Sequence, residues 1–256
     1  MNTIDITFLG TGTSQGVPII ACPCPVCKSP DAKDKRLRSS ILVEMNDTTL
    51  VVDSGPDFRQ QMLREDVKKI DALLFTHAHK DHIAGMDDIR AFNYVLQKPI
   101  DVYADTIVER AMHREFPYIF DGTNYPGIPQ INLKIIGNDT FHVGPVPVIP
   151  IEVMHYNLPV KAFRFGDFTY ITDANFIAEG EKEKIKGSKV VVINALRKEK
   201  HISHYSLEEA IALSQELGAE RTYFTHISHQ LGLHEEVEAE LPKGIFLAYD
   251  GLRVTV

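Results

Sequence analysis

The sequence predicts a single α/β domain, because short apolar runs typical of buried strands alternate with segments of helical periodicity. Its 256 residues, 44% of them hydrophobic and 24% charged, suffice for one large core. The clearest strand-to-helix unit begins with the apolar run Ala72 to Phe75 and continues into Ile83, Met86 and Ile89 to Phe92, which have helical spacing. Other predicted strands also end at a histidine or an aspartate, so we expect one domain, spanning 1–256, that gathers these residues at strand ends.

The net charge and the N-terminus bear on the class of partner and on the compartment. The chain carries 27 Lys and Arg against 35 Asp and Glu, a net charge of -8, which works against a long surface for nucleic-acid phosphates. No stretch approaches the roughly 18 consecutive apolar residues of a membrane helix, and the start MNTIDITFLG lacks the pattern of a signal peptide. We therefore expect a cytoplasmic protein that acts on a small substrate, with no membrane partner and with nucleic acid less favoured.

Periodicity and turn residues predict further elements along the chain. Thr106 and Glu109 have the spacing of a capping box, as do Ser206 and Glu209 at the start of a later helix. The predicted helices are Pro56 to Glu65, Thr106 to Phe116, Glu179 to Lys186 and the one that Ser206 caps. The predicted strands are Ile4 to Leu9, Ser40 to Met45, Thr48 to Val52, Ala72 to Phe75, Val146 to Met154, Phe163 to Phe165, Phe168 to Thr172, Val190 to Ile193, Thr222 to Thr225 and a closing hairpin, Gly244 to Val256, across Asp250-Gly251.

The segment Asp71 to Gly85, DALLFTHAHKDHIAG, has the pattern His-x-His-x-Asp-His directly after a predicted strand. His77 and His79, two residues apart, can point the same way in extended backbone and bind one ion. Asp81 and His82 fall in the turn and can face a second ion. The alternative is a polar surface loop in which three histidines and an acid meet by accident, and the spacing favours the metal site.

Single polar residues after later strands complete two sets of metal ligands. Alone, a histidine at a strand end is more often a hydrogen-bonded polar residue than a ligand. Beside the first cluster, we expect these residues to bind metal. The expected ligands are His77, His79 and His155 for the first ion, Asp81, His82 and His226 for the second, and Asp173 as the bridge between them.

Two other segments near the site each have two interpretations. Asp53, at the end of Thr48 to Val52, either orients a ligand histidine or, like Ser54, caps the following helix. The loop Gly10 to Gly16 is either a tight turn with a close backbone approach or a phosphate cradle, although it lacks the lysine and spacing of a P-loop. The proline- and glycine-rich stretch Pro117 to Pro129 is expected to be a loop, and covering the site is one role for it.

All three cysteines, Cys22, Cys24 and Cys27, lie in the stretch ACPCPVCKSP. Three cysteines cannot pair off as disulfides. In a cytoplasmic chain, the spacing Cys-x-Cys-x-x-Cys favours three thiolates on one tetrahedral ion, usually zinc, with a fourth ligand elsewhere. The prolines at 18, 23, 25 and 30 are expected to rule out helix and stiffen the loop, which a bound metal would hold. The alternative is three small buried thiols.

The order of the histidine and aspartate motifs resembles that of the metallo-beta-lactamase superfamily of hydrolases along nearly the whole chain, including the early strand that ends in Asp53. The resemblance implies an αββα sandwich and two catalytic divalent metals. The nitrogen and oxygen ligands suit zinc or manganese. The beta-lactamases of this fold commonly use a cysteine ligand and lack a bridging aspartate, and the diiron electron-transfer members have Glu where this chain has His79. Neither group matches the full ligand set.

Within that superfamily, GTGTSQGVPIIACPCPVC (10–27) and THISHQ (225–230) look like the PhnP-like phosphoribosyl cyclic phosphodiesterases of phosphonate breakdown. That group carries a structural zinc on three cysteines and a late histidine, and it suggests a homodimer. The segment HYSLEEA, with His204 and Glu208, also looks like the histidine motif of the transfer RNA 3' processing endonucleases, which lack the cysteines. The quinone cofactor biosynthesis relatives share the cysteines, but the full ligand set favours the diesterases. The structural zinc ligands that the resemblance implies are Cys22, Cys24, Cys27 and His229.

The sequence therefore predicts a dinuclear metal phosphodiesterase that acts on a small cyclic phosphodiester. Two metals about 3.5 to 4 Å apart would make hydroxide from a bridging water at neutral pH and neutralise the phosphoryl oxygens. Asp81 would bind metal and orient that hydroxide. Protonated His204 would steady the phosphoryl oxygens or protonate the leaving alkoxide; a polar residue at the head of a helix is its alternative role. A transfer RNA 3' processing-type endonuclease and a thioester or lactam hydrolase are the alternative functions.

Overall fold

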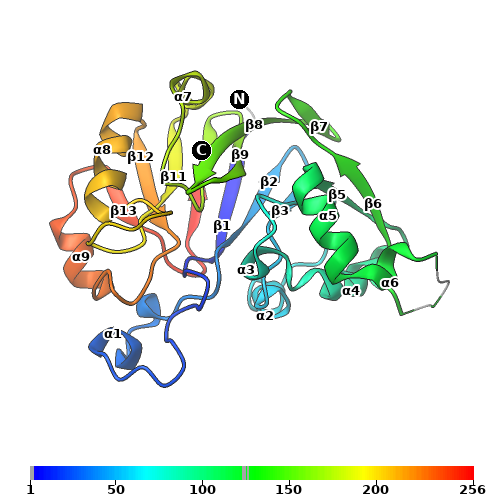
Figure 1. Cartoon of the computed structure of the whole chain (residues 1–256), viewed down its shortest axis with the longest axis horizontal. Coiled ribbons are helices and arrows are strands. Elements are labelled where there is room, and N and C mark those ends of the chain that lie inside the picture. Colours follow the sequence, from blue (N-terminus) through cyan, green and yellow to red (C-terminus); the bar gives the residue numbers. More distant parts are fainter. Residues whose placement is uncertain (1–2, 123–124, 126) are drawn as a thin grey trace.

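Two seven-stranded sheets pack face to face in the computed structural model, which describes residues 3–122, 125 and 127–256 (Figure 1). In each sheet, the strands pair antiparallel at one end and parallel at the other. The first sheet has the order β14 (Arg253–Thr255), β1 (Ile4–Gly10), β2 (Ser40–Met45), β3 (Thr48–Val52), β4 (Ala72–Leu74), β5 (Ile100–Ala104) and β6 (Ile131–Ile135). The second has the order β13 (Ile245–Leu247), β12 (Arg221–Thr225), β11 (Val190–Asn194), β10 (Phe168–Tyr170), β9 (Leu158–Phe165), β8 (Val146–His155) and β7 (Phe141–Val143).

Helices flank the two sheets, while a short helix lies in the N-terminal loop that extends from one edge of the molecule (Figure 1). No helix in the described part of the chain combines the length and apolarity needed to cross a bilayer. The helices beside the first sheet are α2 (Phe58–Arg64), α3 (Lys80–Ile83), η2 (Met86–Ile89), α4 (Arg90–Leu96), α5 (Thr106–Glu115) and α6 (Pro117–Phe120). Those beside the second are α7 (Glu179–Ile185), α8 (Leu207–Leu217) and α9 (His234–Glu240), and the N-terminal loop holds α1 (Pro25–Lys28) and η1 (Ala32–Asp34).

Three large apolar clusters fill the spaces between these four layers. The cluster between the sheets contains Phe8 from the first sheet and Phe163 and Phe168 from the second, all fully buried. A second cluster lies between the first sheet and its helices, and a third lies between the second sheet and its helices. Each fully buried phenylalanine stabilises the fold by about 1.5–3 kcal/mol. This arrangement confirms the α/β class and the αββα sandwich.

Local sequence signals placed several elements correctly. The hairpin of β2 and β3 turns at Asn46 and Asp47, whose φ angles of +52° and +59° are those that a two-residue hairpin turn requires. At the start of α8, the Ser206 hydroxyl accepts a hydrogen bond from the Glu209 N–H, and Glu209 accepts one from the Ser206 N–H. The predicted capping box there is confirmed.

Three local predictions were wrong. Asp105, not Thr106, caps α5, because its carboxylate accepts hydrogen bonds from the N–H groups of Ile107 and Val108. The cysteine segment contains one helical turn, α1, which starts at Pro25, where a proline costs no hydrogen bond. The stretch Pro117 to Pro129 was predicted to be a loop, but it begins with the helical turn α6, whose first residue is also a proline, Pro117. Residues 123, 124 and 126 of that stretch lie outside the described residues.

The closing hairpin was also wrong, because the two C-terminal strands belong to different sheets. β13 pairs with β12 in the second sheet, whereas β14 pairs with β1 in the first. The turn between them is fixed by contacts to the first sheet and its loops: the Gly251 N–H donates to the Phe8 carbonyl, and Asp250 accepts hydrogen bonds from Thr11 and from the Leu37 N–H. The chain therefore crosses between the sheets at a turn that resembles a hairpin in sequence.

Candidate metal centre

The segment after β4 brings four predicted ligands to the carboxyl end of a parallel strand. His77 and His79 lie in extended chain, and Asp81 and His82 lie in α3, the single helical turn that follows. The turn approaches the loop after β3 closely. A Cβ atom on Gly55 would lie 2.0 Å from the Asp81 carbonyl oxygen, which no side chain tolerates. Glycine at this position therefore permits the close approach of the two loops that carry the site.

The structure divides the predicted ligands into two groups that share one aspartate. In the first group, His77 Nε2 lies 3.0 Å from His79 Nδ1 and 3.6 Å from Asp173 Oδ2. In the second, His82 Nε2 lies 3.2 Å from Asp81 Oδ2 and 3.5 Å from Asp173 Oδ2. The remaining member, His226, lies with Nδ1 2.9 Å from Asp173 Oδ1. Asp173 thus touches both groups.

His155 lies between the first group and His204. Its ring centroid lies 5.2 Å from that of His79 and 5.9 Å from that of His77, so it borders the first group. Its donor atom also lies within 4.8 Å of those of Asp173 and His204. The His155 Nδ1–H donates to the Ser203 carbonyl at 2.7 Å, which fixes the ring so that Nε2 is the nitrogen available to an ion.

Asp53 orients His82, which decides between its two interpretations. The fully buried carboxylate accepts a hydrogen bond from His82 Nδ1 at 2.7 Å and two more from the backbone and hydroxyl of Thr76, both at 2.8 Å. The residue before α2 is Asp57, and no side chain caps that helix. With its Nδ1–H engaged by Asp53, the His82 ring presents Nε2 to the centre.

Strained backbone supports the same residues. Asp53, Asp173 and His226 all have positive φ angles, of +65°, +54° and +55° respectively. Such conformations are costly for residues with side chains and tend to persist at functional sites, where the surrounding structure enforces them. Each of these residues directly follows or closely follows a strand, so the strained conformations occur at the strand ends that carry the centre.

The electrostatics of the centre favour bound cations. Burial alone would raise the pKa of Asp173, but the neighbouring His226 and His82 hold it well below its usual range. Burial would likewise lower the pKa of His82, yet the carboxylates of Asp173, Asp81 and Asp53 raise it well above its usual value. The buried His82 Nε2 lies 3.2 Å from Asp81 Oδ2, and the buried His226 Nδ1 lies 2.9 Å from Asp173 Oδ1. Buried histidine nitrogens that face carboxylates form a donor set that divalent metals fit.

His204 lies against two of the predicted metal ligands. Its ring centroid is 4.5 Å from that of His155 and 4.8 Å from that of His226. Burial and the charge of neighbouring His226 lower the pKa of His204 to about 3, so the imidazole is neutral at pH 7 in the unliganded protein. An acid role therefore requires that a bound phosphate anion raise this pKa.

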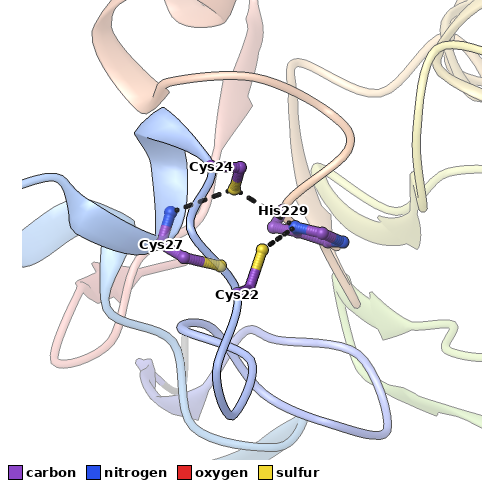
Figure 2. Close-up of side chains that lie close together, drawn as sticks. All are labelled: Cys22, Cys24, Cys27 and His229. Carbon is purple, nitrogen blue, oxygen red and sulfur yellow. Dashed lines mark hydrogen bonds between the residues drawn. The ribbon is translucent and has the colours of Figure 1, made fainter.

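The three cysteines and His229 converge on one point, as Figure 2 shows. His229 Nδ1 lies 3.4 Å from the sulfur of Cys22 and 3.3 Å from that of Cys24, and the Cys24 sulfur accepts a hydrogen bond from the Cys27 N–H. That hydrogen bond, with the one from His229, lowers the pKa of the Cys24 thiol to about 6, whereas burial raises the pKa of Cys27 to about 11. The set of three sulfurs and one nitrogen fits a tetrahedral zinc ion. We call these four residues the cysteine clip.

Two supporting features were not singled out from the sequence. Thr13, in the glycine loop, hydrogen-bonds to His226 Nε2 at 3.2 Å, which leaves His226 Nδ1 to face Asp173. Arg36 is fully buried, and its guanidinium donates to Thr11 Oγ1 and contacts His234 Nδ1 at 3.0 Å. Neither pattern has a sequence signal of its own, because both contacts join segments far apart in the chain.

The glycine loop itself lies against the segment that precedes β2. Cβ atoms on Gly10 and Gly12 would lie 1.9 Å from the Arg38 carbonyl oxygen and 2.8 Å from that of Arg36. Close backbone approach therefore explains these two glycines. For the Pro117 to Pro129 stretch, the Tyr118 hydroxyl donates to Asp87 at 2.7 Å, and its role as a cover for the site remains a prediction.

An αββα sandwich with histidines and aspartates gathered at its strand ends defines a hydrolase of the metallo-beta-lactamase fold, a fold whose members bind divalent metals such as zinc. Residues 48–227 match the family model of the beta-lactamase superfamily domain. The chain therefore belongs to the beta-lactamase superfamily.

Three relatives illustrate the range of similarity. A crystal structure described as a new diphosphatase from the PhnP family is 38% identical, covers 98% of this chain and 97% of its own, and has a TM-score of 0.92. An octanoyltransferase of Porphyromonas gingivalis is 37% identical over 97% of this chain and 51% of its own length, so the chain spans about half of that relative. The short form of human tRNase Z is 17% identical with a TM-score of 0.70, covers 98% of both chains, and shows the shared fold alone.

Proposed function

We propose that the protein is a dinuclear metal-dependent phosphodiesterase that hydrolyses a small cyclic phosphodiester. The observation that carries this proposal is the pair of ligand groups that share Asp173, with His204 beside them. The similarity to a PhnP-family diphosphatase over almost the full length of both chains supports phosphoester chemistry. A site with two ions suits an ester whose attacking and leaving oxygens both need stabilisation.

The proposed ligands are those predicted from the sequence, with zinc or manganese as the ions. His77, His79 and His155 would hold one ion, Asp81, His82 and His226 the other, and Asp173 both. When bound, the two ions supply an activated water and charge neutralisation at the phosphoryl group. The fit rests on the buried nitrogens His82 Nε2 and His226 Nδ1, which face carboxylate oxygens of Asp81 and Asp173 at 3.2 and 2.9 Å.

The protein's own residues would then have distinct tasks. Asp81, whose side chain is 11% exposed, would bind metal and orient the attacking water. Asp53 would hold the His82 ring in the correct tautomer through its 2.7 Å hydrogen bond. His204 would meet the phosphoryl group, take up a proton as the phosphate raises its pKa, and donate that proton to the departing alkoxide. The cysteine clip would bind one zinc and hold the N-terminal loop in place.

A screen of diesters tests the proposal. Purified protein loaded with manganese or zinc should open phosphoribosyl 1,2-cyclic phosphate or a 2',3'-cyclic nucleotide, with binding that depends only modestly on salt. An RNA-processing enzyme would instead cleave precursor transfer RNA and lose affinity steeply as salt rises, in proportion to the phosphates it neutralises. Efficient cleavage of the precursor, with every small cyclic diester left intact, would reject the proposal in favour of the endonuclease.

A second candidate function is hydrolysis of a thioester. It takes support from the name of the Porphyromonas gingivalis relative, which denotes acyl transfer. The support is indirect, since half of that relative has no counterpart here and its named activity can reside in that half. An octanoyl thioester included in the same screen separates the two: the phosphodiesterase should leave it intact, and its hydrolysis at a rate above that of all diesters would favour the second candidate.

A further inference from the structure

Three large exposed apolar side chains come from segments that also carry residues of the candidate metal centre. Tyr156, Phe176 and Ile202 are 54%, 57% and 66% exposed, although side chains of this kind are usually buried. Each lies close in the chain to a site residue: Tyr156 comes directly after His155, Phe176 comes three residues after Asp173, and Ile202 comes two residues before His204. We call these three residues the rim surface.

Hydrogen bonds tie the rim surface together through one side chain. The Asn175 amide accepts a hydrogen bond from the Tyr156 N–H at 2.7 Å and donates one to the Ile202 carbonyl at 3.2 Å. The Met154 N–H donates to the Phe176 carbonyl at 2.9 Å, which fixes Phe176 beside the end of β8. Three segments distant in sequence therefore present their apolar residues from one connected piece of backbone.

The same backbone is connected to the histidines of the centre. Ile202 lies between His201, whose ring centroid is 5.2 Å from that of His204, and Ser203, whose carbonyl accepts the His155 Nδ1–H. A substrate bound to the metal ligands would therefore have the rim surface beside it. A flat or apolar group attached to the phosphoester would then contact the rim surface.

Tyr156 has a backbone conformation that points to a role for its ring. It occupies the two-residue turn between β8 and β9 with a φ of +56°, where glycine or asparagine is the usual residue. An aromatic residue at this position costs conformational energy, and its exposed ring does not stabilise the hairpin. The same loop as Ile202 also carries Lys200, whose side chain is 83% exposed and whose ammonium lies 3.9 Å from Glu209. Aromatic surface beside an exposed cation suits a nucleotide.

We propose that the rim surface binds the base of a nucleotide substrate, so that the enzyme selects phosphoesters that carry a nucleobase over base-free ribosyl phosphates. This inference rests on the proposed function and chooses between the two substrates named for it. Stacking on exposed aromatic rings tolerates any base, because every base has a flat π face. Selection should therefore be for the presence of a base rather than for its identity.

Binding of two product-like ligands tests the inference without turnover. Isothermal titration of the metal-loaded protein should give a Kd for adenosine 5'-monophosphate roughly 10- to 100-fold lower than that for ribose 5-phosphate, the range expected for one stacked base. Phe176→Ala and Tyr156→Asn should each remove much of that difference and leave the Kd of ribose 5-phosphate unchanged. Asparagine is chosen because it tolerates the positive φ at 156, and Phe176→Tyr should retain the preference.

A matched control lies on another face of the protein. Leu63 in α2 is 64% exposed and lines an apolar groove that contains none of the predicted metal ligands, so Leu63→Ala should change neither Kd. Kinetics give a second readout: 2',3'-cyclic adenosine monophosphate should have a lower KM than the methyl riboside 2',3'-cyclic phosphate, at similar kcat, and the rim variants should raise only the former.

Three results would overturn the inference. Equal Kd values for the two ligands in the wild-type protein would show that no base is bound. Variants that weaken both ligands equally would show that the residues only support the fold. A wild-type dimer that the Tyr156→Asn and Phe176→Ala pair converts to monomer, with the ligand preference intact, would assign the surface to a second copy of the chain. If no diester is hydrolysed while the nucleotide preference holds, the proposed function fails and the base site stands.

Discussion

Replacement of Asp53 by asparagine should weaken metal binding although Asp53 touches no ion. Asp53 Oδ1 accepts the Thr76 N–H, and Oδ2 accepts both the Thr76 hydroxyl and His82 Nδ1. Asparagine has one acceptor oxygen, so its amide group must face a donor on one side or the other. Loss of one buried hydrogen bond costs about 1–3 kcal/mol, and loss of the charged partner of a ligand histidine typically lowers metal affinity by about 10- to 100-fold.

The measurement is a competition titration against a chelating dye, together with the melting temperature of the metal-free protein. One ion of the proposed pair, the one assigned to His82, should be released first in Asp53→Asn. Asp57→Asn is the matched control, because Asp57 makes a partly exposed ion pair with Arg38 at 3.0 Å and no contact with a ligand histidine. An Asp53→Asn protein that binds both ions with wild-type affinity would refute the reasoning that this carboxylate orients His82.

Three further predictions follow from single contacts. Elemental analysis should find three ions per chain. Cys24→Ser should remove one of them and lower the melting temperature, while the remaining folded protein still hydrolyses substrate. Unchanged metal content in this variant would contradict metal binding by the cysteine clip. His204→Ala should slow hydrolysis of a diester with a poor alkoxide leaving group by about 10²-fold or more and of a nitrophenyl diester much less, whereas equal losses would exclude the acid role. Burial and the charge of Arg36 lower the pKa of His234 to about 4, so the contribution of neutral His234 to stability is present above about pH 6.5 and is lost as the pH falls toward 4. In urea titrations, His234→Gln should therefore lose stability less steeply than the wild-type protein over that range. An identical slope for the two proteins would contradict this prediction.

The folded arrangement also shows why one glycine pair should resist substitution. A Cβ on Gly85 would lie 2.1 Å from the Gly55 carbonyl oxygen, and one on Gly55 would meet Asp81. Sequence reasoning passed over both, since a glycine after a strand or a helix is usually a simple turn signal. Both positions require glycine because two loops, 30 residues apart, must touch for the ligand groups to meet.

Much of the fold was predictable because its signals are local. Apolar runs and turn residues placed the strands of the β2–β3 hairpin at their observed ends, and the spacing of Ser206 and Glu209 placed the start of α8. Backbone hydrogen bonding and side-chain capping involve residues within four positions of one another, so the sequence carries them directly. The same rule failed for α5, because the helix is capped by the carboxylate of Asp105 rather than by the hydroxyl of Thr106.

The candidate site was predictable to the extent that its residues cluster in sequence or follow strands. His77, His79, Asp81 and His82 lie within six positions, and their spacing alone predicted a metal site. His229 has no such signal, and only the family resemblance pointed to it. A single domain over the whole chain, the individual metal roles and a homodimer stay predictions.

The tertiary structure alone decided which distant residues meet. It assigned Asp53 to His82 rather than to a helix cap, and it sent β13 and β14 to different sheets. These outcomes depend on which faces of two sheets can be buried together, a property of the whole chain that no local window contains. The sequence by itself determined the chemistry of the ligands and the strand ends that carry them; packing of the two sheets determined their geometry.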